Sequence, residues 1–293
     1  MYELKHVLGN TYYIESPAKI GLVKLNSTEA VLIDSGSDKD AGKKALRHAE
    51  ALGCTVKAVY TTHSNADHIG GCKIIQSRTG CKIYACGQEC AFTRSPVLEP
   101  SLLYGGNPPK ELRGKFLMAE PSDCEPLTDT SLPEGFEIIP LPGHFLDMVG
   151  YRTPDGVVFL ADCLSSKETL DKYKIGFIYN VRAYLETLEY VKTLKASYFV
   201  PSHAPATEDI TELAQYNTDA VNKVAERICE LSIAPVTFET LLKRIFEDYS
   251  LTMTFEQHAL VGSTVRSYLT YLEKAGRMTA RIEDDMLVFQ AAL

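Results

Sequence analysis

The stretch from Thr61 to Gly71 constrains the fold of this chain more than any other part of the sequence. It reads Thr-Thr-His-Ser-Asn-Ala-Asp-His-Ile-Gly-Gly, after an apolar run at 56–60. This pattern predicts a buried strand, a loop, and then a helix over about 66–77. Four side chains of the stretch can ligate a metal: His63, Asn65, Asp67 and His68. Imidazoles and a carboxylate at this density favour a transition metal, with zinc as the first expectation.

Composition limits the classes of protein that the chain can belong to. The 293 residues carry a net charge of −8, which argues against nonspecific nucleic-acid binding. No apolar run approaches the roughly 18 residues of a membrane span, and Met1–His6 lacks a signal-peptide pattern. We therefore expect a cytoplasmic protein with no membrane partner. The eight cysteines form no C-x-x-C pair and are expected to be reduced, although Cys86 and Cys90 could share a helix face and hold a metal.

The first half of the chain changes from strands alone to strands that alternate with helices. Four strand-like runs lie between residues 2 and 34, and a helix is predicted from Asp38 to Leu52. A strand at 82–85 follows the metal-ligand loop. This order predicts a sheet with helices on its outer face. Residues 93–121 are rich in proline and glycine, which leaves two alternatives open: a lid over a binding site, or a tolerated insertion.

The second half repeats the placement of metal-binding side chains at strand ends. Strand-like runs at 138–141, 157–161 and 198–200 lead to His144, Asp162 and His203 respectively. Chance does not readily put so many histidines and a carboxylate at strand ends, so we expect them to meet at one metal centre. Helices are predicted over 181–194 and 209–231.

The last 62 residues differ in character from the rest. Helices are predicted at 238–249, 254–260 and 263–275, followed by strands at 278–282 and 286–289, a pattern that matches a winged helix. Residues 232–293 hold six Lys or Arg and eight Asp or Glu, and the predicted wing is acidic at 283–285. A nucleic-acid reader should instead be basic. We therefore expect this unit to pack against the preceding domain or a second subunit, and the second case would make a homodimer.

These motifs together resemble the metallo-β-lactamase superfamily over about residues 1–230. The family pattern H-x-H-x-D-H corresponds to 63–68, and its later histidine, bridging aspartate and last histidine correspond to His144, Asp162 and His203. The resemblance implies a four-layer αββα sandwich with the metals at one edge. With the boundary near 232, the chain divides into a catalytic domain at 1–231 and a winged-helix-like domain at 232–293, an arrangement that resembles the β-lactamase-like protein 2 group. The activity that the resemblance implies is similar to that of the glyoxalase II-like group, whose helical tail is different.

Asn65 departs from the family pattern, which has histidine at this position. The resemblance implies a first metal site of His63, Asn65 and His144, and a second of Asp67, His68 and His203, with Asp162 bridging them. An amide oxygen is a weaker ligand than imidazole for a borderline metal. We expect one or two zinc ions, the first site being weak, empty, or filled by another metal such as iron or manganese. The opposite interpretation is that Asn65 still ligates and that two metals persist.

The resemblance implies a metal-dependent hydrolase. A metal-bound water can lose its proton near neutral pH, and the resulting hydroxide attacks a carbonyl or phosphorus centre. Asp67 is assigned the catalytic role of orienting this nucleophile. The expected substrate is a small thioester, ester or lactone; the enzyme alternative is a phosphodiesterase or nuclease. The non-enzyme alternative is a degenerate scaffold whose winged helix binds a partner.

The substrate is expected to be a small, anionic molecule. The resemblance implies that the segment after Asp162 is a loop beside the site. Four residues of this segment are candidates for contacting the substrate: Lys167, Tyr173, Lys174 and Tyr179. The lysines could pair with an anionic group, and the tyrosines could line the pocket. The alternative for the lysines is a solvated basic loop.

Overall fold

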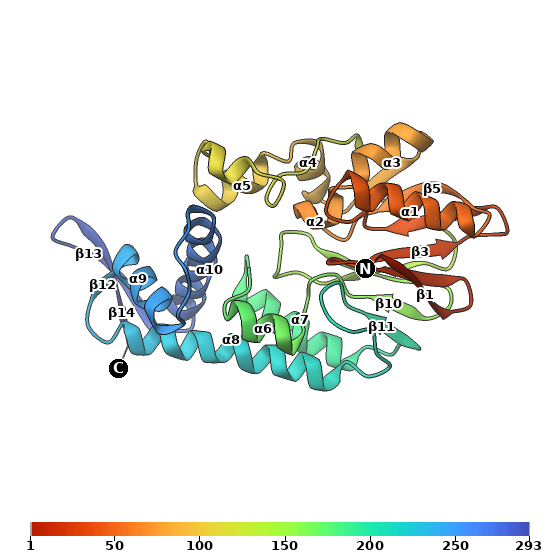
Figure 1. Ribbon diagram of the computed structural model, residues 1–293. Coiled ribbons are helices and arrows are strands. Elements are labelled where there is room, and N and C mark those ends of the chain that lie inside the picture. The colour runs from red at the N-terminus through yellow and green to blue at the C-terminus, as the bar shows by residue number, and fades with distance from the viewer. Residues whose placement is uncertain (1, 293) are drawn as a thin grey trace.

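The computed structural model describes residues 2–292 (Figure 1). The strands are β1 (Glu3–Leu8), β2 (Thr11–Glu15), β3 (Ile20–Lys24), β4 (Glu29–Ile33), β5 (Thr55–Tyr60), β6 (Lys82–Ala85), β7 (Cys124–Pro126), β8 (Glu137–Pro140), β9 (Val149–Arg152), β10 (Val157–Phe159), β11 (Tyr198–Val200), β12 (Val236–Thr237), β13 (Met278–Glu283) and β14 (Met286–Ala291). The helices are α1 (Lys39–Ala51), α2 (Ala66–Ile69), α3 (Cys72–Thr79), α4 (Glu89–Arg94), α5 (Leu98–Tyr104), the 3-10 helix η1 (Lys110–Arg113), α6 (Lys167–Tyr173), α7 (Val181–Thr193), α8 (Thr211–Leu231), α9 (Phe238–Asp248) and α10 (Phe255–Lys274).

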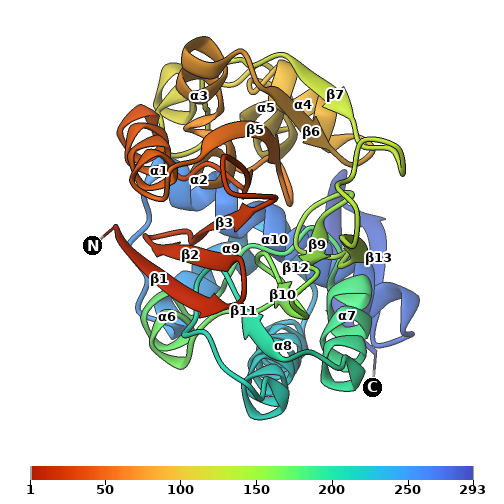
Figure 2. The same cartoon turned by 90° about the vertical axis from the view of Figure 1, so that its right-hand side faces the viewer.

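Two sheets pack face to face between layers of helices. The first has the strand order β1-β2-β3-β4-β5-β6-β7, antiparallel as far as β4 and parallel from β4 to β7; the second has the order β11-β10-β9-β8. Buried side chains such as Ile33, Tyr60, Tyr151 and Phe159 fill the space between the sheets. Figure 2 shows α1 and α3 on one side of the sheets and α7 and α8 on the other. The predicted mixed α/β fold is confirmed.

A pair of glycines breaks the helix that the sequence predicted over 66–77 into α2 and α3. A Cβ atom on Gly70 would lie 2.3 Å from the carbonyl carbon of Ser37, and one on Gly71 would lie 2.3 Å from the carbonyl oxygen of Ser35. The glycines therefore let the loop after β4 cross directly against the loop after β5. This crossing puts Asp34 beside the metal-ligand loop.

Two further helix predictions are corrected. The helices predicted at 254–260 and 263–275 form the single helix α10, in which Gly262 is accommodated without a break. The segment after Asp162 that read as a loop contains α6, where the hydroxyl of Ser166 accepts a hydrogen bond from the amide of Thr169 and caps the helix. The short strand β7 was not predicted.

The C-terminal unit continues the core of the second sheet. It consists of α9, α10 and a sheet of order β12-β14-β13. One cluster of buried apolar side chains runs from Leu160 and Leu188 through α8 to Leu241 and Leu272. In Figure 1 the long helix α8 extends along both parts of the molecule. The two parts therefore share one hydrophobic core.

The proline-rich excursion at 93–121 packs on the C-terminal unit. Leu103 of α5, Leu112 of η1 and Leu117 form a small apolar cluster with Ala259 of α10. Figure 1 shows α5 next to the start of α10. Within residues 2–292, every helix is too short or too polar to cross a membrane.

Candidate metal centre

The predicted metal ligands come from loops at one edge of the two sheets. His63 follows β5, and Asp67 and His68 lie in α2 immediately after it. From the second sheet, His144 follows β8, Asp162 follows β10 and His203 follows β11. Because each residue is placed by a strand that ends at the same edge, residues far apart in the sequence come into contact.

Four of these residues form the predicted second site. The ligating atoms of Asp67, His68, Asp162 and His203 all lie within 4.8 Å of one another. His203 Nε2 is 3.2 Å from Asp67 Oδ2 and 3.1 Å from Asp162 Oδ2, and His68 Nε2 is 3.0 Å from Asp162 Oδ1. Two imidazoles and two carboxylates therefore converge on one point.

The predicted first site lies beside the second and shares Asp162 with it. The ligating atoms of His63, His144 and Asp162 are within 4.8 Å of one another. Asp162 Oδ2 is 3.9 Å from His63 Nε2 and 3.7 Å from His144 Nε2. Asn65 turns its Oδ1 toward this group, 3.1 Å from His144 Nε2. The structure thus brings all seven predicted ligand residues together.

Unpaired polar atoms in the centre indicate that these residues fit a cation. Within the described residues, His63 Nε2, His68 Nε2 and Asp162 Oδ1 are buried and make no hydrogen bond of acceptable geometry. A buried polar atom without a partner costs about 1–3 kcal/mol, so proteins rarely leave three in one place. All three are the atoms through which histidine and aspartate bind metals, and a metal ion would satisfy them.

The histidines are held by their other ring nitrogens. Asp34 Oδ2 is 2.8 Å from His68 Nδ1, and Asp34 also accepts hydrogen bonds from the amide and hydroxyl of Thr62. The Thr62 hydroxyl is in turn 3.0 Å from His63 Nδ1, and the carbonyl of Pro17 is 2.8 Å from His203 Nδ1. These contacts fix the ring orientations and leave each Nε2 directed at the centre.

Burial and the two carboxylates set the protonation of the metal-free centre. Burial, helped by the neighbouring His68, lowers the pKa of His63 well below its usual value. For His203 burial acts in the same direction, but Asp162 and Asp67 outweigh it and raise its pKa to about 10. A metal must therefore displace a proton from His203, so metal affinity should increase with pH.

Two buried glutamates near the centre were missed by the sequence analysis. Glu89 accepts hydrogen bonds from the amide and hydroxyl of Ser64 and from the amide of Asp147. It therefore ties the loop of His63 to the loop of His144, while burial raises its pKa to about 7. Glu99 accepts a hydrogen bond from Asn65. An isolated Glu in a helical stretch gives no sequence signal for such a role, because its burial depends on tertiary packing.

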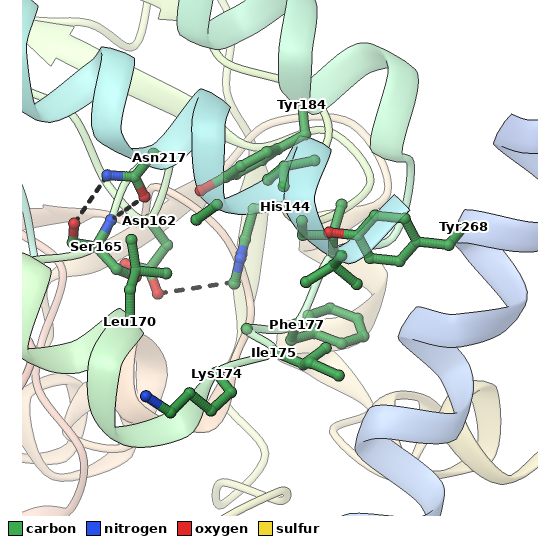
Figure 3. Close-up of a pocket in the computed structure, with 15 residues that line it drawn as sticks. His144, Asp162, Ser165, Leu170, Lys174, Ile175, Phe177, Tyr184, Asn217 and Tyr268 are labelled. Atoms are coloured by element: carbon green, nitrogen blue, oxygen red, sulfur yellow. Dashed lines mark hydrogen bonds and ion pairs between the residues drawn. The ribbon is translucent and has the colours of Figure 1, made fainter. Parts of the chain in front are cut away.

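A small apolar cavity opens next to the metal-ligand cluster (Figure 3). Its volume is about 60 Å³, and both His144 and Asp162 line it. Most of its other walls are apolar or aromatic: Leu170, Ile175, Phe177, Ile178, Tyr184, Val221, Val224 and Tyr268. Tyr268 comes from α10, so the C-terminal unit forms part of the wall.

The structure brings one of the four predicted substrate residues to this cavity. Lys174 lines it. Lys167 forms an ion pair with Glu212, and Tyr173 is about half exposed outside the cavity lining. Tyr179 lines a separate groove between α7 and α10.

The family of the chain follows from these features. The model of the metallo-beta-lactamase superfamily matches residues 9–203, which include all seven predicted ligands. The chain belongs to this superfamily, whose members are generally metal-dependent hydrolases. Solved structures of the same fold extend the likeness beyond the matched residues. No curated protein sequence matches the chain.

Two of these structures cover nearly the whole chain. A metallo-beta-lactamase family protein from Thermus thermophilus has a TM-score of 0.72 at 17% identity, covering 97% of this chain and 99% of its own. A beta-lactamase domain protein from Burkholderia ambifaria has a TM-score of 0.73 at 16% identity, and the match covers 99% of this chain and 94% of that protein. The metallo-beta-lactamase FIM-1 from Pseudomonas aeruginosa, in its mono-zinc form, has a TM-score of 0.58 at 16% identity. That match covers 76% of this chain and 95% of FIM-1. The fold including the C-terminal unit is therefore shared with the first two.

Proposed function

We propose that the protein is a zinc-dependent hydrolase of small esters, thioesters or lactones that carry a short apolar acyl group. The observation that carries this proposal is the apolar cavity beside His144 and Asp162. Its volume of about 60 Å³ corresponds to roughly two small groups, given about 30 Å³ for each water-sized group. Lys174 is the one cation among the described residues of its lining, and it can pair with an anionic group of the substrate.

The residues of the centre would hold the metal and organise the reaction. Imidazoles and carboxylates form a ligand set that suits zinc. When bound, zinc supplies Lewis-acid chemistry that lowers the pKa of water and polarises a carbonyl group. Asp67 is more exposed than Asp162, with 39% against 9% of the side chain accessible. Asp67 is therefore the carboxylate that can accept a hydrogen bond from the attacking water and orient it toward the substrate carbonyl.

Substrate panels distinguish this proposal from a phosphodiesterase. The zinc-loaded protein should hydrolyse acyl thioesters and p-nitrophenyl esters, with the highest kcat/KM for acyl chains of about two to four carbons. Turnover of bis-p-nitrophenyl phosphate without acyl hydrolysis would overturn the proposal. Protein purified without chelator should also contain stoichiometric metal, and its absence would favour the degenerate scaffold.

A cavity-filling variant tests whether this particular pocket binds the acyl group. Val224→Phe should lower kcat/KM for the preferred ester while leaving the metal content unchanged, because Val224 lines the cavity but is not among the metal ligands. Tyr190→Phe, at an exposed position of α7, is the control and should have no effect on either quantity.

A further inference from the structure

Asn65 can bind a metal through only one end of its amide. The Oδ1 atom carries lone pairs, whereas the Nδ2 group is a donor and cannot ligate. A rotation of about 180° around the terminal bond exchanges the two ends with little change in shape. The neighbours of the amide must therefore decide whether oxygen or nitrogen faces the metal centre.

Glu99 is placed to make this decision. Its side chain is 5% exposed, and its Oε1 accepts a hydrogen bond of 2.8 Å from Asn65 Nδ2. Within residues 2–292, the Glu99 side chain makes no other hydrogen bond. When Glu99 is ionised, its carboxylate can only accept hydrogen bonds, so it selects the nitrogen end of the amide. The oxygen end is thereby directed toward His144, with 3.1 Å between Asn65 Oδ1 and His144 Nε2.

We propose that Glu99 is a positioning residue that fixes the Asn65 amide with Oδ1 toward the metal centre, so that Asn65 serves as a ligand of the first site. The proposal rests on the metal centre of the proposed function. It also gives the excursion at 93–121 a role, because Glu99 lies in α5 and α5 packs on α10 through Leu103 and Ala259.

Zinc titration of metal-free protein against a competing chromophoric chelator tests the proposal. In Glu99→Gln the new amide can accept from or donate to Asn65, so neither orientation is selected. We expect first-site affinity to fall by roughly 10-fold or more, with second-site affinity unchanged. The control is Glu111→Gln, an exposed change of the same charge in the same excursion, which should alter neither affinity.

A double-variant cycle separates positioning from a general effect of charge or folding. If Glu99 acts through Asn65, then Glu99→Gln should have no effect on zinc affinity in the Asn65→Ala background. An equal fold-loss in both backgrounds, or an equal loss at both sites, would overturn the proposal. The far-UV circular dichroism and Tm of each metal-free variant establish that it is folded.

Asn65→Asp supplies a second test that reverses the sign of the effect. A carboxylate has no donor end to be oriented, and Glu99 then faces a second acidic group. In the Asn65→Asp background, Glu99→Gln should therefore strengthen zinc binding at the first site. A weakening there would contradict the proposal. If the unsubstituted protein binds no zinc at all, the proposed function fails first, which this titration reveals separately.

Discussion

At the scale of single residues, Asn65 makes the two halves of the centre unequal. The second half has two imidazoles and two carboxylates, whereas the first has an amide where the superfamily pattern has imidazole. Amide oxygens bind borderline metals more weakly than imidazole nitrogens do. The first site should therefore load at a higher zinc concentration than the second.

Asn65→His should remove this inequality. Imidazole is the better ligand, and Glu99, which accepts a hydrogen bond from Asn65, can accept one from the other ring nitrogen. First-site affinity should rise by about 10-fold or more, and zinc per protein after dialysis against buffered low zinc should approach two. Elemental analysis measures this ratio. A ratio unchanged from that of the unsubstituted protein would show that Asn65 does not limit loading.

Protonation of His203 predicts how stability of the metal-free protein depends on pH. Against the effect of burial, Asp162 and Asp67 raise the pKa of His203 from 6.5 to about 10. Because the folded pKa is the higher one, the stabilisation is complete below about pH 6.5 and is lost as pH rises through about 10. Chelator-treated protein should therefore lose roughly 3–4 kcal/mol of unfolding free energy between pH 7 and 10.

Urea unfolding at several pH values measures this loss. Zinc-loaded protein is the comparison, because the metal takes the place of the proton and should keep the centre paired at high pH. His203→Gln should be less stable than the unsubstituted metal-free protein at pH 7 and should show a flatter dependence. If the unfolding free energy depended on pH in the same way for the metal-free protein, the zinc-loaded protein and His203→Gln, this account would be contradicted.

At the scale of elements, the sequence predicted what depends on local pattern. The ends of β5, β10 and β11 could be predicted because each apolar run stops shortly before a polar residue that can ligate a metal. Glu89 and Glu99 could not be identified, since their burial arises only when the helices after β6 fold over the centre. Likewise, the break predicted between 260 and 263 is absent: Gly262 lies within α10, and a Cβ atom there would lie 3.5 Å from Leu242 and 3.6 Å from Phe238 of α9.

The crossing of loops at Gly71 carries a stability prediction. A Cβ atom there would lie 2.3 Å from the carbonyl oxygen of Ser35, a backbone atom that cannot move aside cheaply. Gly71→Ala should therefore destabilise the protein by about 1–3 kcal/mol and weaken metal binding, because the crossing loop carries Asp34. Gly106→Ala, where nothing lies within 4 Å of the added atom, is the matched control and should be close to neutral. Thermal unfolding with a parallel zinc titration measures both effects.

At the scale of the whole molecule, the boundary predicted at residue 231 lies in a continuous core. Apolar side chains of α8 such as Val224 and Ile228 belong to the same buried cluster as Leu241 and Leu272. The C-terminal unit also supplies Tyr268 to the cavity beside the metal centre. The unit is therefore expected to stabilise the catalytic part and to shape its pocket, rather than to fold separately.

Shortening the chain and weakening the shared core should have different consequences. A protein ending at residue 231 would expose the apolar face of α8, so it should aggregate or unfold. In the full chain, Leu272→Ala removes a fully buried side chain and should cost about 2–5 kcal/mol. Because the core is continuous, Leu272→Ala should lower one cooperative transition, observed together by far-UV circular dichroism and by release of zinc. Two separate transitions, or a soluble 1–231 fragment with full metal content, would instead show that the C-terminal unit is an independent domain.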